Sequence, residues 1–187
     1  MNSDDPVAML NGITDELISA LKAHKTTLKT NPNLVYSLAN KIIVPHADLD
    51  EMSKRVLPPS VWKSSTSTQK TQFEKEFTDL LIHTYASALA SYSDQTVKFY
   101  PLRGKADDKK SVIVKSDIIP SDGPPIPMSY NLIRSGSAWK LYDMTVDGVS
   151  LLQSFRSQFA DKLGQGNMEA LIKELKEHNA KTVPGDS

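Results

Sequence analysis

The sequence contains no cysteine, which excludes disulfide bonds and cysteine-based metal sites. It also has no run of about 18 apolar residues, the length that a helix needs to cross a bilayer. The 22 basic and 22 acidic residues leave a formal net charge of zero. The chain therefore has neither the basic footprint of a nucleic-acid binder nor the basic excess that holds a protein to anionic membranes.

The motifs of common enzymes and metal sites are missing as well. There is no glycine-rich phosphate loop, no H-E-x-x-H motif and no G-x-S-x-G motif. The histidines are scattered along the chain, and His83 lies away from the apolar side of its predicted helix, so we expect it to face solvent. The sequence therefore predicts no metal site, no cofactor and no catalytic group that stands out.

The first half of the chain predicts helices. Asp5 followed by Pro6 is a helix start, because an aspartate can cap free N–H groups and proline suits the first turn. The longest helix should run from about residue 68 to 92, and Thr66 with Gln69 resembles a capping box before it. Apolar residues cover about half the circumference of this helix, which favours contacts on two sides.

After residue 93 the apolar period changes from helical to alternating. The alternation predicts four strands, around residues 97–99, 112–118, 126–132 and 139–146, joined by short turns into an antiparallel meander. Two further helices should follow, at about 151–163 and 168–177. The fold class is therefore α+β, with N-terminal helices, a four-stranded sheet and C-terminal helices. We expect one domain over residues 1–180 and a flexible tail over residues 181–187.

Asp143 offers the strongest case for catalysis. It interrupts the apolar run from Leu141 to Met144 in a predicted strand. A carboxylate in such surroundings can act as a general base, with Tyr130 or Tyr142 as a donor. Because no second titratable group stands beside it at a useful spacing, we favour a structural role, in which Asp143 accepts hydrogen bonds from the backbone or a neighbouring side chain.

Three segments together resemble the MlaC, or toluene-tolerance, family over roughly residues 5–180. Each segment alone is weakly specific for this family, but the three segments in this order and at this spacing are more specific for it. The first segment runs from Asn31-Pro32 to Val44-Pro45. The second runs from Trp62-Lys63 to Tyr92 and contains Phe73, Phe77, Leu80-Leu81 and Thr84-Tyr85-Ala86. The third runs from Trp139 to Met144 and is followed by Val146 to Leu151.

The resemblance implies a periplasmic phospholipid carrier rather than an enzyme. Such a carrier holds the acyl chains in a deep apolar pocket between sheet and helices, and it helps to maintain outer-membrane lipid asymmetry. Its implied partners are the substrate-binding subunit of an inner-membrane ABC transporter and an outer-membrane lipoprotein complex. The polar, acidic start of the chain is not a signal peptide, so we expect the mature form of a periplasmic protein, and we expect a monomer.

We expect the pocket to be lined by apolar residues from helices and strands. The candidates are Val35, Leu38, Ile42, Phe73, Phe77, Leu80, Leu81, Tyr85, Leu89, Val97, Phe99, Val114, Ile118, Met128, Tyr130, Leu132, Leu141, Met144, Val149, Leu152 and Phe155. Two other interpretations stay open. One is a small-molecule isomerase or hydrolase of the cone-shaped α+β type that uses Asp143, and the other is a binding module that docks a partner helix in the same groove.

Overall fold

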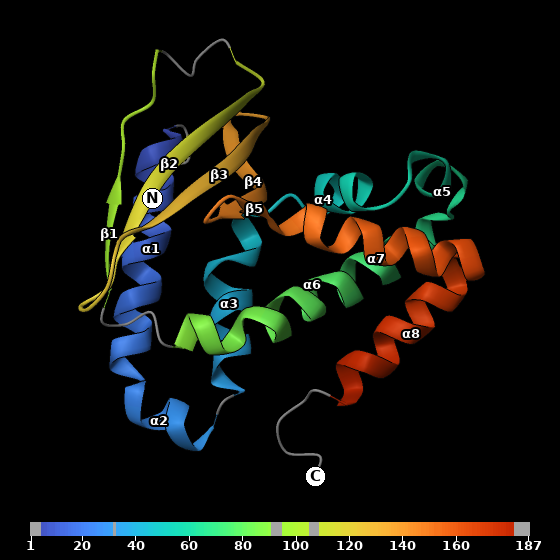
Figure 1. Ribbon diagram of the computed structural model, residues 1–187, viewed down its shortest axis with the longest axis horizontal. Helices are drawn as coiled ribbons and strands as arrows, with labels where there is room; N and C mark the ends of the chain where they lie inside the picture. Colours follow the sequence, from blue (N-terminus) through green and yellow to red (C-terminus); the bar gives the residue numbers. More distant parts are fainter. Residues whose placement is uncertain (1–4, 32, 91–94, 105–108, 182–187) are drawn as a thin grey trace. The chain divides into compact units, whose positions relative to one another are not determined.

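The computed structural model describes residues 5–31, 33–90, 95–104 and 109–181. The elements run, in chain order, α1 (Pro6–Ala23), α2 (Lys25–Thr30), α3 (Leu34–Ile42), η1 (Val44–His46), α4 (Leu49–Val56), α5 (Pro59–Ser64), α6 (Ser67–Ala90), β1 (Thr96–Phe99), β2 (Ser111–Ile119), β3 (Ile126–Ser135), β4 (Ala138–Val146), β5 (Val149–Ser150), α7 (Leu151–Gln165) and α8 (Met168–Lys181) (Figure 1). Helices, then antiparallel strands, then helices confirm the predicted α+β class. Of the tail predicted to be flexible, Lys181 belongs to α8, and residues 182–187 lie outside the described part of the chain.

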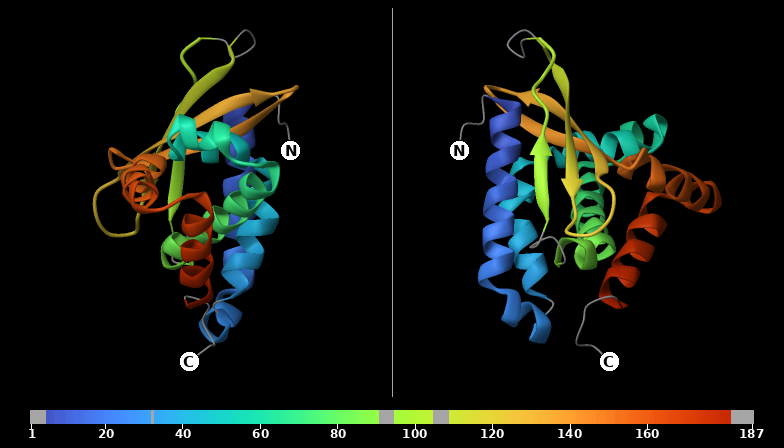
Figure 2. Two further views of the ribbon diagram at one scale, coloured as in Figure 1. Left: turned by 90° about the vertical axis from the view of Figure 1, so that its right-hand side faces the viewer. Right: turned by 60° about the vertical axis from the view of Figure 1, so that its left-hand side comes forward.

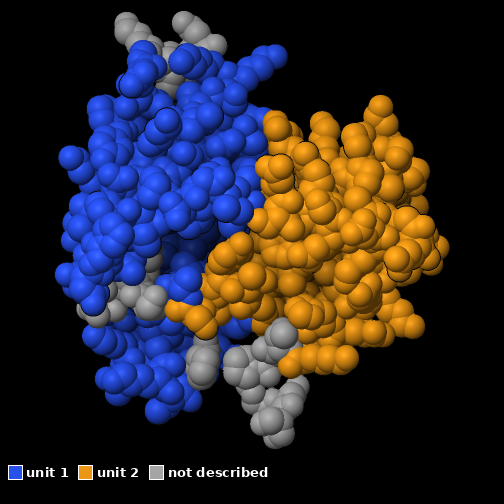
Figure 3. All heavy atoms as spheres, in the orientation of Figure 1, with its two compact units in different colours: residues 1–48, 88–151 blue, residues 49–87, 152–187 orange. Residues whose placement is uncertain are grey.

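The chain forms two compact units, and each takes two separate stretches of sequence. Unit 1 consists of residues 1–48 and 88–151, and unit 2 consists of residues 49–87 and 152–187 (Figure 3). Unit 1 holds the sheet with α1, α2 and α3, whereas unit 2 holds α4, α5, most of α6, α7 and α8. The single domain expected over residues 1–180 stays a prediction.

The first helix of unit 1 begins where its capping residue predicts. The Oδ1 atom of Asp5 accepts hydrogen bonds from the backbone N–H groups of Val7 and Ala8, at 3.0 and 3.2 Å. These bonds satisfy two of the N–H groups that the first turn of a helix leaves without a backbone partner. Helix α3 packs alongside α1, as both views in Figure 2 show. Together they supply the helical side of unit 1.

The sheet is an antiparallel meander in the order β1-β2-β3-β4-β5. The four predicted strands are present, and the short strand β5 was missed. Asp147 and Gly148 have positive φ angles of 50° and 86°, and Val146 pairs with Val149 across them. Such a two-residue turn favours Asp-Gly, because both positions require positive φ. Gly148 therefore does not end the sheet but folds the chain back into a fifth strand.

Unit 2 is built around α6, which starts with the predicted capping box. The Thr66 hydroxyl accepts a hydrogen bond from the Gln69 N–H at 3.1 Å, and the Gln69 side chain accepts one from the Thr66 N–H at 3.0 Å. The predicted end of this helix, at residue 92, lies outside the described residues. Figure 2 shows α8 turning back at an angle from the end of α7. The Arg156 guanidinium of α7 donates to the backbone oxygen of Arg55 at the end of α4, which ties these two helices together.

Candidate functional site

One face of the sheet carries many of the apolar residues predicted to line a pocket. Side chains along a strand point alternately to opposite sides, and directly paired residues share a side. Val114 pairs with Tyr130, and Ile118 pairs with Val97. The predicted residues on this face are Val97, Phe99, Val114, Ile118, Met128, Tyr130, Leu132, Leu141 and Met144. The antiparallel pairing thus places on one face of the sheet side chains from residues that are spread over nearly fifty positions of the sequence.

A β-bulge in β4 explains how Leu141 and Met144 come to share this face. They are three residues apart, so in a regular strand they would point to opposite sides. The pairing between β3 and β4 shifts between Asn131 and Leu132, which leaves Tyr142 as an extra residue in β4. The bulge therefore keeps apolar residues on one side of the sheet both before and after it.

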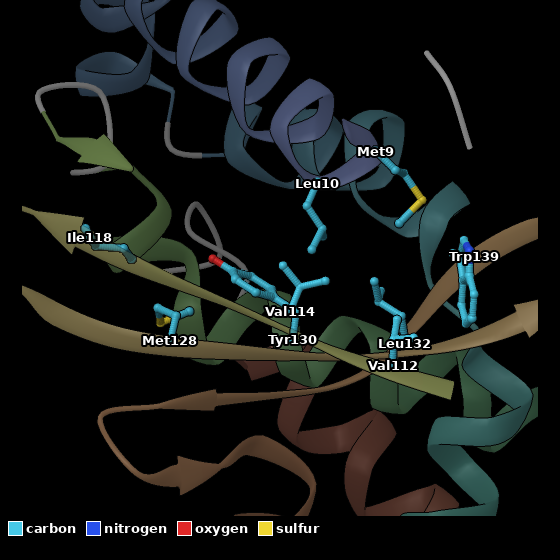
Figure 4. Packing of buried hydrophobic residues seen from close by; sticks show 9 residues of the cluster. All are labelled: Met9, Leu10, Val112, Val114, Ile118, Met128, Tyr130, Leu132 and Trp139. Carbon is cyan, nitrogen blue, oxygen red and sulfur yellow. The ribbon is translucent and has the colours of Figure 1, made fainter. Parts of the chain in front are cut away.

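Helix α1 covers part of this sheet face. Met9 and Leu10 of α1 pack in one buried cluster with strand residues, and Figure 4 shows Leu10 pointing toward Val114. Val112 and Trp139 belong to the same cluster. The sequence prediction left these four cluster members out, although Val112 alternates with Val114 and Trp139 alternates with Leu141. The pattern could have identified the two strand residues, but the contact with α1 depends on the tertiary fold.

The margin of the face is less enclosed than its centre. Phe99 on β1 and Met144 on β4 are only half-buried, and so are Val97, Leu141 and Val146. Leu132 and Val114, on the central strands, are almost fully buried. The half-buried side chains give unit 1 apolar surface that is chemically suited to contact an apolar ligand. Val149, also predicted as a lining residue, is 59% exposed on β5.

Two hydroxyl groups interrupt this apolar face. The Ser116 Oγ and the Tyr130 hydroxyl oxygen lie 3.0 Å apart and share a hydrogen bond. Burial raises the pKa of the Tyr130 phenol, and the hydrogen bond to Ser116 opposes that rise. A tyrosine phenol is neutral around pH 7 even without this rise, so Tyr130 keeps its hydroxyl proton.

A second apolar cluster in unit 1 joins its helices. Leu38 and Ile42 of α3, both predicted lining residues, pack with Leu17 and Leu21 of α1. Leu89, near the end of α6, is half-buried against this cluster. Val35, the remaining candidate on α3, is buried as well.

An aromatic cluster forms the centre of unit 2. The ring of Phe77 lies 5.6 Å from those of Phe73 and Phe159 and 5.8 Å from that of Phe155. Phe73, Phe77 and Phe155 were predicted to line the pocket, whereas Phe159 was missed, although it lies one helical turn beyond Phe155. The burial and mutual packing of these rings give them a structural role, and their contact with a ligand stays a prediction.

The other candidates in unit 2 differ in exposure. Leu80 and Leu152 are buried, while Leu81 and Tyr85 are half-buried on α6. Burial raises the pKa of the Tyr85 phenol. Leu81 and Tyr85 are therefore the candidates of unit 2 that still present apolar surface.

The contacts of Asp143 match its predicted structural role. One carboxylate oxygen accepts a hydrogen bond from the backbone N–H of Met144 at 2.8 Å, and the other accepts one from the Ser150 hydroxyl at 2.5 Å. These bonds hold β5 against the bulge in β4. Of the two proposed donors, Tyr130 bonds Ser116 on the opposite side of the sheet and so does not pair with Asp143.

His83 is half-buried on α6, so it faces solvent only in part. Burial lowers its pKa, and the nearby His178 of α8 lowers it further. The helical period of α6 could not reveal this, because the neighbour comes from a helix almost a hundred residues later. Within the described residues, no three histidine, aspartate or glutamate side chains group as metal ligands do.

Unit 2 also contains an open depression of about 450 Å³ between the ends of its helices. Most of the residues that line it are small or polar, and Val61, Leu163 and Met168 are the larger apolar ones. The full lining is Val61, Ser64, Ser65, Gln69, Leu163, Gly166, Asn167, Met168 and Glu169. It includes none of the residues predicted to line the pocket. The predicted pocket between sheet and helices therefore stays a prediction.

These features define a class of protein: an α+β fold whose antiparallel sheet presents one largely apolar face, interrupted by the Ser116 and Tyr130 hydroxyls, without a recognisable catalytic centre in the described residues. No helix in the part of the chain that the structure describes has the length and hydropathy needed to cross a membrane. The MlaC protein family model matches residues 11–177. The chain belongs to the MlaC family, as its sequence segments predicted.

Relatives and a solved structure support this assignment. The chain is 34% identical to toluene tolerance protein ttg2D of Pseudomonas putida, over 84% of this chain and 73% of that protein. It is 25% identical to the intermembrane phospholipid transport system binding protein MlaC of Haemophilus influenzae, over 95% of this chain and 84% of that protein. The structure of a phospholipid-binding protein from Ralstonia solanacearum, in complex with a phospholipid, matches with a TM-score of 0.85 and 32% identity, covering 95% of this chain and 98% of that one.

Proposed function

We propose that this protein binds one phospholipid and carries it through the periplasm between the two membranes. The observation that carries the proposal is the Ralstonia solanacearum relative, whose structure contains a phospholipid and whose fold matches this one over almost its whole length. The transport role follows from the Haemophilus influenzae relative, a binding protein of an intermembrane phospholipid transport system. As a member of the MlaC family, the chain is a carrier and not an enzyme, as predicted from its sequence.

The energetics of lipid extraction demand a large apolar surface. Two acyl chains of a typical phospholipid contain about 30 methylene groups, and each contributes about 0.8 kcal/mol when it leaves water. A carrier must therefore offset on the order of 25 kcal/mol. The apolar sheet face of unit 1 supplies such surface, because its half-buried margin has side chains such as Phe99 and Met144 still available for contact. The candidates predicted from the sequence remain our proposal for the lining of the lipid site.

The proposed partners are those of a lipid shuttle. One is the substrate-binding subunit of an inner-membrane ABC transporter, and the other is an outer-membrane lipoprotein complex. Delivery between these two would maintain the lipid asymmetry of the outer membrane. The neutral net charge of the chain suits a carrier that must leave a membrane again, because it avoids tight electrostatic retention on anionic lipid.

Native mass spectrometry of the protein purified from a Gram-negative periplasm tests the binding step. We expect a species heavier than the bare chain by one phospholipid, and phospholipid in its organic extract. Delipidated protein should regain this species after incubation with phospholipid vesicles. If the purified protein has only the mass of the bare chain and takes up no lipid from vesicles, the proposal is wrong.

A further inference from the structure

Ser116 and Tyr130 form a polar pair in the middle of the apolar sheet face. Ser116 lies on β2 between Phe99 of β1 and Met128 of β3 in the pairing register. Tyr130 lies on β3 between Val114 and Met144. All four flanking side chains are apolar, and the Phe99 ring lies 5.7 Å from that of Tyr130. The two hydroxyl groups are therefore a local exception on a surface that otherwise suits hydrocarbon.

The pair has one hydrogen-bond donor more than its own contact uses. Each hydroxyl carries one proton, and a hydrogen bond between the two oxygens engages only one of them. The oxygens are 3.0 Å apart, and no other described residue bonds to either of them. Ser116 is 1% exposed and Tyr130 is 7% exposed, so solvent reaches neither residue freely. A buried donor without an acceptor is costly, which points to an acceptor that arrives with a ligand.

The chemistry of a diacyl phospholipid provides a matching acceptor. Its acyl chains are hydrocarbon up to the ester group, where a carbonyl oxygen accepts hydrogen bonds and donates none. An ester lying on this face would place hydrocarbon against side chains such as Met128 and Phe99 and a carbonyl against the hydroxyls. A tyrosine phenol is protonated around pH 7 even in water, and burial raises the pKa of Tyr130 further, so the pair can donate to such a carbonyl.

We propose that the Ser116–Tyr130 hydroxyl pair donates a hydrogen bond to an ester carbonyl oxygen of the bound phospholipid. The inference rests on the proposed function and extends it, because it makes the protein selective for ester-linked over ether-linked lipids. It also sets where the glycerol end of an acyl chain lies along the sheet, at the level of the pairs Ser116–Met128 and Val114–Tyr130. A face lined by hydrocarbon alone would neither distinguish ester-linked from ether-linked lipids nor fix where the glycerol end lies.

Competition between two lipids tests the inference. Delipidated protein is offered a diacyl phosphatidylethanolamine and its dialkyl ether analogue, matched in chain length and headgroup, and the bound fractions are read by native mass spectrometry. One neutral hydrogen bond should favour the ester lipid by about three- to tenfold in the wild-type protein. The double variant Ser116→Ala/Tyr130→Phe should bind both lipids about equally, because it removes both donors and keeps the aromatic ring.

Ser129→Ala is the matched control. It deletes a hydroxyl from the neighbouring position of β3, which points to the other side of the sheet, so the ester preference should persist. Equal binding of the two lipids by the wild-type protein overturns the inference, and this comparison needs no variant to fold. An ester preference that survives in the double variant overturns it too. Failure of the wild-type protein to bind either lipid instead overturns the proposed function, and this inference with it.

Discussion

Asn179 of α8 donates two hydrogen bonds to Glu76 of α6 from the same amide nitrogen. The Nδ2 atom lies 2.9 Å from the Glu76 backbone oxygen and 2.8 Å from its Oε2 atom. Glu76 is 3% exposed and Asn179 is 6% exposed, so both bonds are shielded from water. A carboxyl group is rarely buried to this degree unless it is hydrogen-bonded, and Asn179 meets that need. The pair thus fixes α8 on α6 within unit 2.

Replacing Asn179 by alanine should destabilise the protein strongly. Asn179→Ala takes the amide donor from the buried Glu76 carboxylate, while the Glu76 backbone oxygen keeps its bond within α6, so we expect the free energy of unfolding to fall by about 2–4 kcal/mol. Urea denaturation followed by circular dichroism measures this change. Lys176→Ala, on an exposed position of the same helix, should change it by less than about 0.5 kcal/mol. Equal effects of the two substitutions would contradict the structural role of Asn179.

His83 should make stability depend on pH. Its pKa is lowered in the folded chain by burial and by His178, whereas an unfolded histidine titrates near 6.5. The unfolded chain therefore binds this proton more readily, and the free energy of unfolding should fall as the pH drops below about 6.5, until the folded pKa is passed. His83→Gln should reduce this fall between about pH 7.5 and pH 5.5, measured by urea denaturation at each pH.

The control for His83 is Ser87→Gln, one helical turn further along α6. Ser87 is exposed and does not titrate, so this variant should keep the wild-type dependence on pH. If His83→Gln and Ser87→Gln lose stability equally on acidification, His83 is not the group responsible.

Local patterns predicted the fold well where the cause of an element lies close in sequence. Asp5 with Pro6, and Thr66 with Gln69, start their helices because the capping contacts span only two or three residues. The strand β5 was missed because a two-residue strand has no period to detect. Its presence depends on the Asp147-Gly148 turn and on pairing with β4.

The candidate site was predictable mainly on the sheet. Alternation places Val114 and Met128 on their strands, and the meander then brings both to one face. In contrast, the partners of Glu76 and His83 come from α8, a hundred residues away in the chain, and no local pattern predicts such contacts. Apolar periodicity also cannot separate a side chain that packs into a core from one that contacts a ligand, as the buried Phe77 illustrates.

Truncation of Phe77 should destabilise the protein severely. Its ring is 1% exposed and contacts three other phenylalanine rings, so Phe77→Ala leaves a large cavity in unit 2. We expect a loss of about 3–5 kcal/mol in the free energy of unfolding, measured by denaturant titration. Gln72→Ala, exposed on the same helix, serves as the control and should be nearly neutral. A loss below about 1 kcal/mol for Phe77→Ala would show that the aromatic cluster is not a tight core.

Ser53 should tolerate the loss of its hydroxyl. It is fully buried in α4, and its Oγ atom has no hydrogen-bond partner among the described residues. Because burying a hydroxyl without a partner is unfavourable, Ser53→Ala should leave the free energy of unfolding unchanged or raise it by up to about 1 kcal/mol. Ser53→Val, which keeps the site apolar but adds volume, should lower it by about 1–3 kcal/mol. A marked loss of stability in Ser53→Ala would reveal a hydrogen bond that its surroundings do not suggest.

A charge on the apolar sheet face should reduce lipid occupancy. Met128 is buried on β3 between Ser116 and Val146, so Met128→Arg would place a guanidinium where we propose that acyl chains lie. Such a group must keep water or a counter-charge, and either one displaces hydrocarbon. We expect the phospholipid-bound fraction in native mass spectra to fall by at least about tenfold, which corresponds to about 1.4 kcal/mol.

Leu81→Arg extends this test to α6, where the half-buried side chain can project its charge toward solvent more easily than Met128→Arg can. We therefore expect this variant to fold and yet bind less phospholipid, whereas Met128→Arg also loses stability. Ser129→Arg carries the same charge on the opposite side of the sheet, next to Met128 in sequence, and should keep full occupancy. If Leu81→Arg and Met128→Arg both fold and stay fully loaded, neither side chain lines the lipid site. If Met128→Arg fails to fold while Leu81→Arg stays loaded, Met128 belongs to the core of unit 1 and the lipid lies elsewhere.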